Sequence, residues 1–243
     1  MEYSSLHAAI PGYIVAYIYE LPSTNTRAIE LAHAGAPSRT LVVADHQTQG
    51  RGRRGRSWDS SLGGAWFSLL LRPKQVQGLT ILAALAVREA CGIADIQPGI
   101  KWPNDILWQG RKLCGILVEA STQGWAVVGV GINVCQLEFP PELQETAISL
   151  QQATGRVITR EAVIQAFCES FDRRLPIFEE QGIAALLPEY AAHSVTLGRR
   201  VFTDGCIEGI AERLGPQGEL LLRLDSGEIK SVWAGDVSIR GCI

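Results

Sequence analysis

The sequence has little cysteine or histidine, and none of it stands in a spacing that is typical of metal binding. Six cysteines are scattered along 243 residues, with no Cys-x-x-Cys pair. They lie at positions 91, 114, 135, 168, 206 and 242. This distribution argues against a zinc site and against the disulfide framework of a small secreted domain. We expect reduced thiols, mostly in the core, and no role for the four histidines.

The chain also lacks an uninterrupted hydrophobic run near its start. The apolar stretch "AAIPGYIVAYIYEL" at residues 8–21 has no Lys or Arg ahead of it and is broken by Pro11 and Gly12. This pattern fits neither a signal peptide nor a membrane-spanning helix. We therefore predict a cytoplasmic protein with no membrane partner.

Positive charge is not in excess, because 22 Lys and Arg residues stand against 25 Asp and Glu residues, a formal net charge of −3. A surface for bulk nucleic-acid binding would be basic. With 47% hydrophobic and 19% charged residues, the chain can bury a sizeable core in one large domain or in a large and a small one. Because the chain as a whole is not basic, the arginines of its one dense basic segment must act locally. This segment is "GRGRRGRSW" at residues 50–58.

Runs rich in Val, Ile, Leu and aromatic residues dominate residues 13–134 and predict a central sheet. They are "YIVAYIYEL", "TLVVADHQ", "AWFSLLLRP", "DILW", "KLCGILVEA" and "WAVVGVGINV". Several connections are short enough for hairpins, which favours a mixed sheet of the α+β class over a purely parallel one.

Three segments have helical signals: "TNTRAIELAHAG", "LTILAALAVREACG", which ends at a glycine, and "TREAVIQAFCESFDRRLPIFEEQG". Ser23 or Thr24 is the expected N-cap of the first helix, and Gly35 its stop. The third helix should begin after Thr159 and kink or end near Pro176, because proline cannot donate the helical hydrogen bond.

After about residue 194 the pattern changes to short apolar runs separated by the turn signals "GPQG" and "DSG". This pattern predicts a small all-β barrel at residues 194–243, following a larger domain at residues 1–193. Residues 135–158 are interpreted as a connection that carries short irregular helix.

The glycines of the basic segment match Gly-x-Gly-x-x-Gly, but their context is wrong for a dinucleotide-binding fold. That motif needs a helix to begin inside it and an acidic residue roughly 20 positions further on. Here a turn and a strand follow, and no acidic residue lies between Asp59 and Glu89. No Walker-type phosphate loop is present either. A solvated loop, a weak RNA contact and a specific anion site remain open.

Further polar residues stand at strand ends. Lys101 and Lys112 flank a predicted hairpin, so that both ammonium groups could border one cleft. A Trp-Pro pair forces extended backbone before Asn104 and Asp105. Asp105 either caps this turn or binds Mg²⁺, a ribose or an ammonium group.

Small and amide side chains complete the set of candidates. Gly129 and Gly131 lie within a predicted strand, which is often a sign of close approach by a ligand or by other backbone. Asn133 follows in an apolar neighbourhood. A strand-to-helix junction holds residues that suit either helix capping or a small polar ligand, namely Ser23, Thr24 and Asn25.

In this order, the segments closely resemble the biotin protein ligases over nearly the whole chain. The matching motifs are "STN" at 23–25, "ADHQTQGRGRRGRSW" at 44–58, "KWPNDI" at 101–106, "RKLCGILVE" at 111–119 and "GVGINV" at 129–134. Gln49 departs from the small residue usual in the family. Fewer than 25 residues precede "STN", so the resemblance is to the monofunctional form without the DNA-binding domain, and no DNA partner is expected.

The resemblance implies a class II synthetase-like, biotin/lipoate ligase fold, in which a mixed sheet is flanked by helices and followed by an SH3-like β-barrel. It implies that biotin is activated with ATP and Mg²⁺ to biotinyl-5′-AMP, and that biotin is then transferred to a lysine of a biotin carboxyl carrier protein, an acetyl-CoA carboxylase subunit. A monomer or weak homodimer is expected. A lipoate–protein ligase or octanoyltransferase of the same fold is the alternative, and a non-catalytic nucleic-acid-binding module is a remote one.

The same resemblance implies roles for individual residues. The implied catalytic residues are Lys112 and Arg53. Those implied for biotin binding are Ser23, Thr24, Asn25, Gln47, Gly50, Arg51, Gly52, Arg53, Lys112 and Gly115. Those implied for ATP binding are Arg53, Arg56, Trp58, Lys101, Asn104, Asp105 and Asn133. Strand residues such as Trp66 or Leu117 are expected to form the apolar wall, and the metal ligands are left open.

We predict that residues 50–56 are mobile until an anion binds, because four neighbouring arginines repel one another and three glycines raise the conformational entropy of the loop. Bound biotin and ATP would supply the missing negative charge. Hydrogen exchange in this segment should therefore slow when both ligands are added. Unchanged exchange in the saturated complex would contradict a loop that closes over its ligands.

Overall fold

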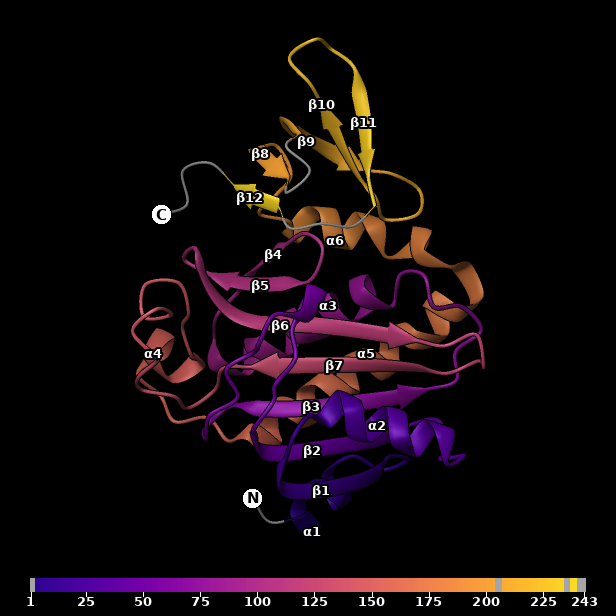
Figure 1. Cartoon of the computed structure of the whole chain (residues 1–243), viewed down its shortest axis with the longest axis vertical. Coiled ribbons are helices and arrows are strands. Elements are labelled where there is room, and N and C mark those ends of the chain that lie inside the picture. Colours follow the sequence, from indigo (N-terminus) through magenta and orange to yellow (C-terminus); the bar gives the residue numbers. More distant parts are fainter. Residues whose placement is uncertain (1–2, 204–206, 234–236, 240–243) are drawn as a thin grey trace.

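A computed structural model describes residues 3–203, 207–233 and 237–239, and its larger part is built on a seven-stranded mixed sheet (Figure 1). The strands are β1 (Ile14–Leu21), β2 (Thr40–Gln47), β3 (Ala65–Leu71), β4 (Gly99–Lys101), β5 (Asp105–Trp108), β6 (Arg111–Ala120) and β7 (Ala126–Ile132). Their order is β1-β2-β3-β7-β6-β5-β4. Only β1 and β2 pair in parallel, which confirms the predicted mixed sheet of the α+β class.

Helices cover the two faces of this sheet unequally. On one face, α1 (Tyr3–Ala9), α3 (Leu79–Ala90) and α5 (Arg160–Gln181) enclose the main core, into which Val43 and Leu69 point. On the other, the ten-residue α2 (Thr24–His33) packs on Val42, Leu70 and Val127 in a smaller cluster. Because α2 is short, part of this second face is covered by the connection between β2 and β3 rather than by a helix (Figure 1).

The first predicted helix begins and ends as expected. Ser23 is its N-cap, and the Ser23 side chain accepts a hydrogen bond from the backbone N–H of Thr26 at 3.4 Å. Gly35, just past the last turn, has a φ of 84°, which glycine adopts at little cost. The second helix continues as a 3₁₀ turn, Cys91–Ala94, beyond the predicted stop at Gly92.

The helix α5 begins after its N-cap Thr159 as predicted, but it does not end at Pro176. It runs for 22 residues to Gln181, and Gly182 is its C-cap. Phe171 and Phe178, on either side of the proline, are both fully buried. An interior proline costs about 3 kcal/mol, and burying two aromatic side chains in the core offsets that cost.

The C-terminal unit is an antiparallel sheet in the order β11-β10-β9-β8-β12. Its strands lie in the region where the sequence predicted short β runs: β8 (Arg200–Thr203), β9 (Glu208–Leu214), β10 (Leu220–Arg223), β11 (Ile229–Val232) and β12 (Val237–Ile239). The preceding helix α6 (Leu187–His193) and the strand β4 are elements that the sequence analysis missed.

Trp102 joins the two units, because its indole N–H donates to the Gly218 carbonyl at 3.0 Å. The boundary at residue 194 stays a prediction.

The connection at residues 135–158 contains one short helix, α4 (Leu150–Thr154), as predicted. Its start is held by a capping box in which Ser149 and Gln152 bond each other's backbone N–H groups.

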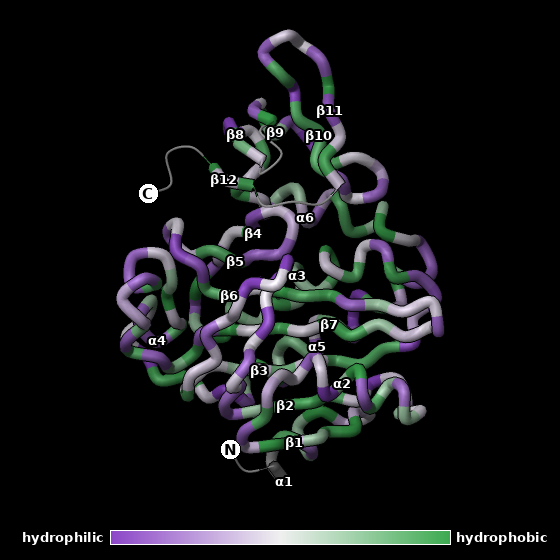
Figure 2. Tube along the Cα trace, viewed as in Figure 1, coloured by the Kyte–Doolittle hydropathy of each residue, from purple (hydrophilic) through white to green (hydrophobic). Residues whose placement is uncertain are grey.

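Hydrophobic residues concentrate along the inner strands and β10, whereas the connections are mostly hydrophilic (Figure 2). No helix among the described residues is both long and apolar enough to cross a membrane.

The described cysteines are free thiols, and most of them lie in the core. Burial raises the pKa of Cys91 and Cys168 to about 12 and that of Cys114 well above its usual value. Cys135 is half-buried, and positions 206 and 242 lie outside the described residues. Within the described ranges, no three His, Cys, Asp or Glu side chains are grouped as metal ligands.

Candidate active site

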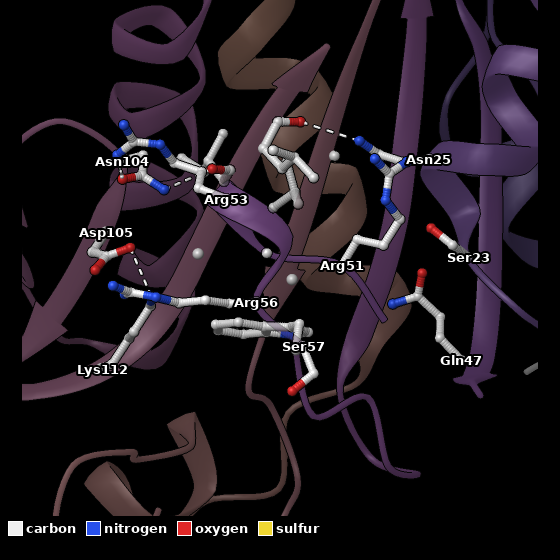
Figure 3. A pocket seen from close by; sticks show the side chains of 18 of the residues that line it. Ser23, Asn25, Gln47, Arg51, Arg53, Arg56, Ser57, Asn104, Asp105 and Lys112 are labelled. Atoms are coloured by element: carbon white, nitrogen blue, oxygen red, sulfur yellow. Dashed lines mark hydrogen bonds and ion pairs between the residues drawn. The ribbon is translucent and has the colours of Figure 1, made fainter. Parts of the chain in front are cut away.

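A cavity of about 250 Å³ lies on the sheet face that α2 leaves uncovered. It is lined by every residue for which the resemblance implies a catalytic, biotin-binding or ATP-binding role except Gly50 and Asn133: Ser23, Thr24, Asn25, Gln47, Arg51, Gly52, Arg53, Arg56, Trp58, Lys101, Asn104, Asp105, Lys112 and Gly115. Figure 3 shows Asn104, Asp105 and Lys112 on one side of the cavity, opposite Ser23, Asn25 and Gln47. Segments far apart in the chain therefore form one site.

The floor of the cavity is backbone without side chains. Gly115 of β6 and Gly131 of β7 are directly opposite each other in the sheet. The indole of Trp58 packs against both, since a Cβ built at Gly131 would be 2.5 Å from Trp58 Nε1 and one at Gly115 would be 2.9 Å from the ring. A Cβ at Gly129 would clash with the Asn25 amide. For Gly129 and Gly131 the sequence indicated close approach by a ligand or by other backbone, and the groups that approach them in the structure are the side chains of Asn25 and Trp58.

One end of the cavity is a buried hydrogen-bond network around the start of α2. The backbone N–H and the hydroxyl of Thr24 donate to Gln47 Oε1 at 2.7 and 3.0 Å. Ser68 Oγ donates to Asn25 Oδ1 at 2.6 Å, and Gln47 Nε2 donates to Ser60 Oγ at 2.7 Å. These bonds fix which donors and acceptors face the cavity. Ser60 and Ser68 were not selected from the sequence, since neither belongs to a motif typical of a binding site.

The other end carries the cations. Lys112 Nζ lies 2.8 Å from Asp105 Oδ1 and 5.1 Å from the centre of the Trp58 ring. The pair faces across the hairpin of β5 and β6, which confirms the hairpin predicted between Lys101 and Lys112. The sequence left Mg²⁺, a ribose or an ammonium group open as the partner of Asp105, and in the structure its partner is the ammonium group of Lys112.

The turn before β5 is held rigidly by its neighbours. Arg53 Nη1 donates to Asn104 Oδ1 at 2.8 Å, and Asn104 Nδ2 donates to the Ile116 carbonyl at 2.8 Å. The Trp102–Pro103 peptide bond is cis. The hydroxyl of Tyr190 donates to the Pro103 carbonyl at 3.2 Å, and burial raises the pKa of Tyr190, which keeps it a neutral donor.

The basic loop at residues 50–58 folds back on itself above the floor. The backbone N–H of Gly52 donates to the Arg56 carbonyl at 2.7 Å, and that of Trp58 donates to the Gly50 carbonyl at 2.9 Å. Arg54, at the tip, has a φ of 58°. Gly50 does not line the cavity because it packs behind the loop, where a Cβ would clash with the Trp58 carbonyl and Ser60.

A second cavity of about 200 Å³ adjoins the first at Ser57, Trp58 and Lys112. Its remaining lining residues are Asp59, Asn133, Phe139, Leu143, Thr146 and Ala147. Asn133 therefore lies in this cavity rather than in the first one, with its amide donating to the Ile148 carbonyl at 3.2 Å. Phe139 and Leu143 were missed because the connection that carries them has no regular hydrophobic period.

The apolar wall of the first cavity includes one of the two strand residues that the sequence suggested for it. Leu117 lines the first cavity as expected, but Trp66 does not. The Trp66 side chain is fully buried behind Trp58, and its indole N–H donates to the Ser61 carbonyl at 3.0 Å. Lining residues that the sequence analysis did not select include Ser57, Ile116, Val130, Val237 and Ser238. The last two come from β12, so the C-terminal unit contributes to the site.

Comparison with known proteins identifies relatives over most of the chain. A family model described as the biotin/lipoate A/B protein ligase family matches residues 17–134. The bifunctional ligase/repressor BirA of Bacillus subtilis is 39% identical, with 96% of this chain and 76% of that protein covered. The biotin--[acetyl-CoA-carboxylase] ligase of Paracoccus denitrificans is 33% identical, with 84% and 92% covered.

A solved structure with the same fold is that of a biotin protein ligase from Aquifex aeolicus in complex with biotin and ATP. It superimposes with a TM-score of 0.84 and 33% sequence identity, over 93% of this chain and 98% of that chain. The biotin protein ligase from Aquifex aeolicus therefore has the same fold as this chain, a mixed sheet followed by a C-terminal antiparallel sheet.

We predict that Gly131→Ala unseats the basic loop, because the new methyl group occupies the space of the Trp58 indole. Overpacking of this kind costs about 1–3 kcal/mol, so the loop should open roughly tenfold more often and trypsin should cleave it correspondingly faster at its arginines. Gly92→Ala is the matched control, since the nearest atom to its Cβ is 3.9 Å away. Equal cleavage of both variants and the parent would show that Trp58 does not depend on this glycine.

Proposed function

The chain belongs to the biotin protein ligase family, and from this membership we propose that it is a biotin--[acetyl-CoA-carboxylase] ligase. It activates biotin as biotinyl-5′-AMP and transfers it to a lysine of the biotin carboxyl carrier protein. The observation that carries the proposal is that two cavities of different character meet at one cation, Lys112.

The first cavity suits biotin. Leu117, Val130 and the Trp58 ring give it apolar surface for a flat bicyclic ring. The network at the start of α2 offers amide and hydroxyl groups to the ureido ring, which both donates and accepts hydrogen bonds. The wall residues Ser23, Thr24, Asn25 and Gln47, with Gly52 and Gly115, form this part of the site. The biotin carboxylate then extends toward Lys112.

The second cavity suits the base of ATP. Phe139, Leu143 and Ala147 provide apolar surface, and Trp58 provides an aromatic edge. Asn133 holds the segment that carries these apolar residues, because its amide donates to the Ile148 carbonyl. With the base placed there, the phosphates lie toward the cationic end of the first cavity, which holds Lys101, Arg53 and Arg56, together with Asn104 and Asp105.

Adenylation brings two anions together, since a carboxylate oxygen attacks the α-phosphorus and the bond to the β-phosphate oxygen breaks. Positive charge placed at the reacting atoms lowers this barrier. Lys112 borders both cavities and meets the carboxylate and the α-phosphate in turn, with Arg53 beside it. In the second step the carrier amine attacks the activated carbonyl, AMP leaves with the bonding electrons, and the amine loses a proton. No nucleophile from the enzyme is required.

Mg²⁺ would arrive with ATP and neutralise phosphate charge. The described lining of the first cavity contains a single carboxylate, Asp105, and Lys112 already neutralises it. Mg²⁺ is commonly held by one or two carboxylates together with substrate phosphates. The residues therefore fit an ion carried by ATP, with Asp105 as its protein contact, better than a dedicated metal site.

Two alternatives are disfavoured by the arrangement of the loop and by the relatives. A nucleic-acid-binding loop would present its arginines outward, whereas Arg51 and Arg53 pair with Glu119 and Asn104 across the site. Lipoate or octanoyl transfer is disfavoured because the named relatives are biotin ligases. Cytoplasmic location, a monomeric or weakly dimeric state, and the lack of a DNA-binding function stay predictions.

We expect the protein to label a carrier domain when it is incubated with radiolabelled biotin, ATP and Mg²⁺. Labelled lipoate, tested in parallel, should give no product, and a carrier whose acceptor lysine is replaced should stay unlabelled. Transfer of lipoate in preference to biotin would reassign the substrate, and failure to release pyrophosphate with biotin would refute adenylation.

We further predict that Lys112→Met slows adenylation by about 10²–10³, the loss typical of one well-placed charged donor. Pyrophosphate release in a single turnover measures this rate. The Lys112 side chain is 35% exposed and is paired with Asp105. A small loss of thermal stability is therefore expected, since partly exposed pairs contribute about 0–1 kcal/mol.

Lys74→Met is the control for this substitution, because Lys74 is exposed and lines neither cavity. It should keep the parent rate. A Lys112→Met protein that retains more than about a tenth of the parent rate, far above the expected loss, would remove Lys112 from the catalytic residues.

A further inference from the structure

The carboxylate of Glu119, on β6, joins two parts of the site that are far apart in the chain. Arg51 Nη2 donates to Glu119 Oε1 at 2.8 Å, and Arg51 Nη1 donates to Oε2 at 3.1 Å. Asn25 Nδ2 donates to the same Oε2 at 2.9 Å. Arg51 belongs to the basic loop and Asn25 to the start of α2. One side chain therefore holds both the loop and the wall of the cavity.

Glu119 itself does not line the cavity, whereas Arg51 and Asn25 both do. Its side chain is 25% exposed, against 45% for Arg51. Any effect of Glu119 on a ligand must therefore pass through these two neighbours. The two-point contact with a guanidinium is the geometry in which an ion pair is strongest.

Asn25 has little freedom to move in response. It is 4% exposed, and Ser68 Oγ donates to its Oδ1 at 2.6 Å. Its amide also lies against Gly129, where no side chain would fit. With Asn25 fixed, the Glu119 carboxylate is fixed as well, and it presents a rigid acceptor to the arginine of the loop.

We propose that Glu119 is a positioning residue that fastens the basic loop to the wall of the cavity through Arg51 and so sets how long bound biotin is retained. This inference rests on the proposed function. Closure of the loop costs conformational entropy, and the Arg51–Glu119 pair offsets part of that cost when the loop lies over the floor.

The test compares Glu119→Gln with the parent in two measurements. Gln keeps an oxygen that can accept from Asn25 but removes the charge and the two-point contact with Arg51. Without ligand, trypsin should cleave the loop faster. With biotin, the dissociation rate measured by displacement of radiolabelled biotin should rise roughly 3- to 10-fold. The single-turnover rate of adenylation at saturating biotin should change by a smaller factor, because Lys112 is untouched.

Two further variants separate positioning from simple structural damage. In an Arg51→Gln background, Glu119→Gln should add little, because its effect passes through Arg51. Glu119→Ala should release biotin faster than Glu119→Gln does, since Asn25 then loses its acceptor too. Glu212→Gln is the matched control, because it breaks an ion pair in the C-terminal sheet, in which Arg223 Nε lies 2.8 Å from Glu212 Oε2. This variant should leave both measurements unchanged.

The outcomes are distinguishable. A parent that binds no biotin refutes the proposed function and the retention role with it. A parent that binds biotin, with cleavage and dissociation unchanged in Glu119→Gln, refutes the positioning role alone. Equal effects of Glu119→Gln with and without Arg51 also refute it, because the path through Arg51 would then be absent.

Discussion

The site depends on a contact between an aromatic ring and backbone that carries no side chains. Trp58 lies against Gly115 and Gly131, which pair across β6 and β7, and Asn25 lies against Gly129 in the same way. Each of these positions would clash if it had a Cβ. The glycines let a loop and a helix start approach the sheet closely enough to enclose a cavity, and the ridge formed by Trp58 and Lys112 divides that cavity from its neighbour.

The placement of charge follows from this enclosure. Four arginines on one short loop would repel one another in solution, but Arg51 is drawn to Glu119 at one end of the cavity and Arg53 to Asn104 at the other. The loop is thus spread across the site instead of extending from it. Lys112, held by Asp105, stands between the two cavities, where an acid and a nucleotide would meet.

Much of the fold could be predicted because its signals are local. The strand runs, the N-caps Ser23 and Thr159, and the hairpin before Lys112 depend on neighbouring residues alone. Local rules say less where distant packing also acts, as at the proline near which α5 was predicted to kink or end. Pro176 does not end α5, because phenylalanines on both of its sides are buried. Of the two strand residues given as examples for the apolar wall, Leu117 lines the cavity, whereas Trp66 is buried behind Trp58.

The sequence by itself determined which chemical groups are present and in what order, and that order was enough to predict the sheet, the C-terminal strands and most of the residues that line the first cavity. Only the tertiary structure decided their partners. Ser68, Phe139 and Leu143 had no distinguishing local pattern, Glu119 stood in a recognised motif without a role, and Asn133 was assigned to the site without its cavity. Their roles arise from contacts between residues far apart in the chain, and such contacts are set by how the sheet, the loop and the helices pack.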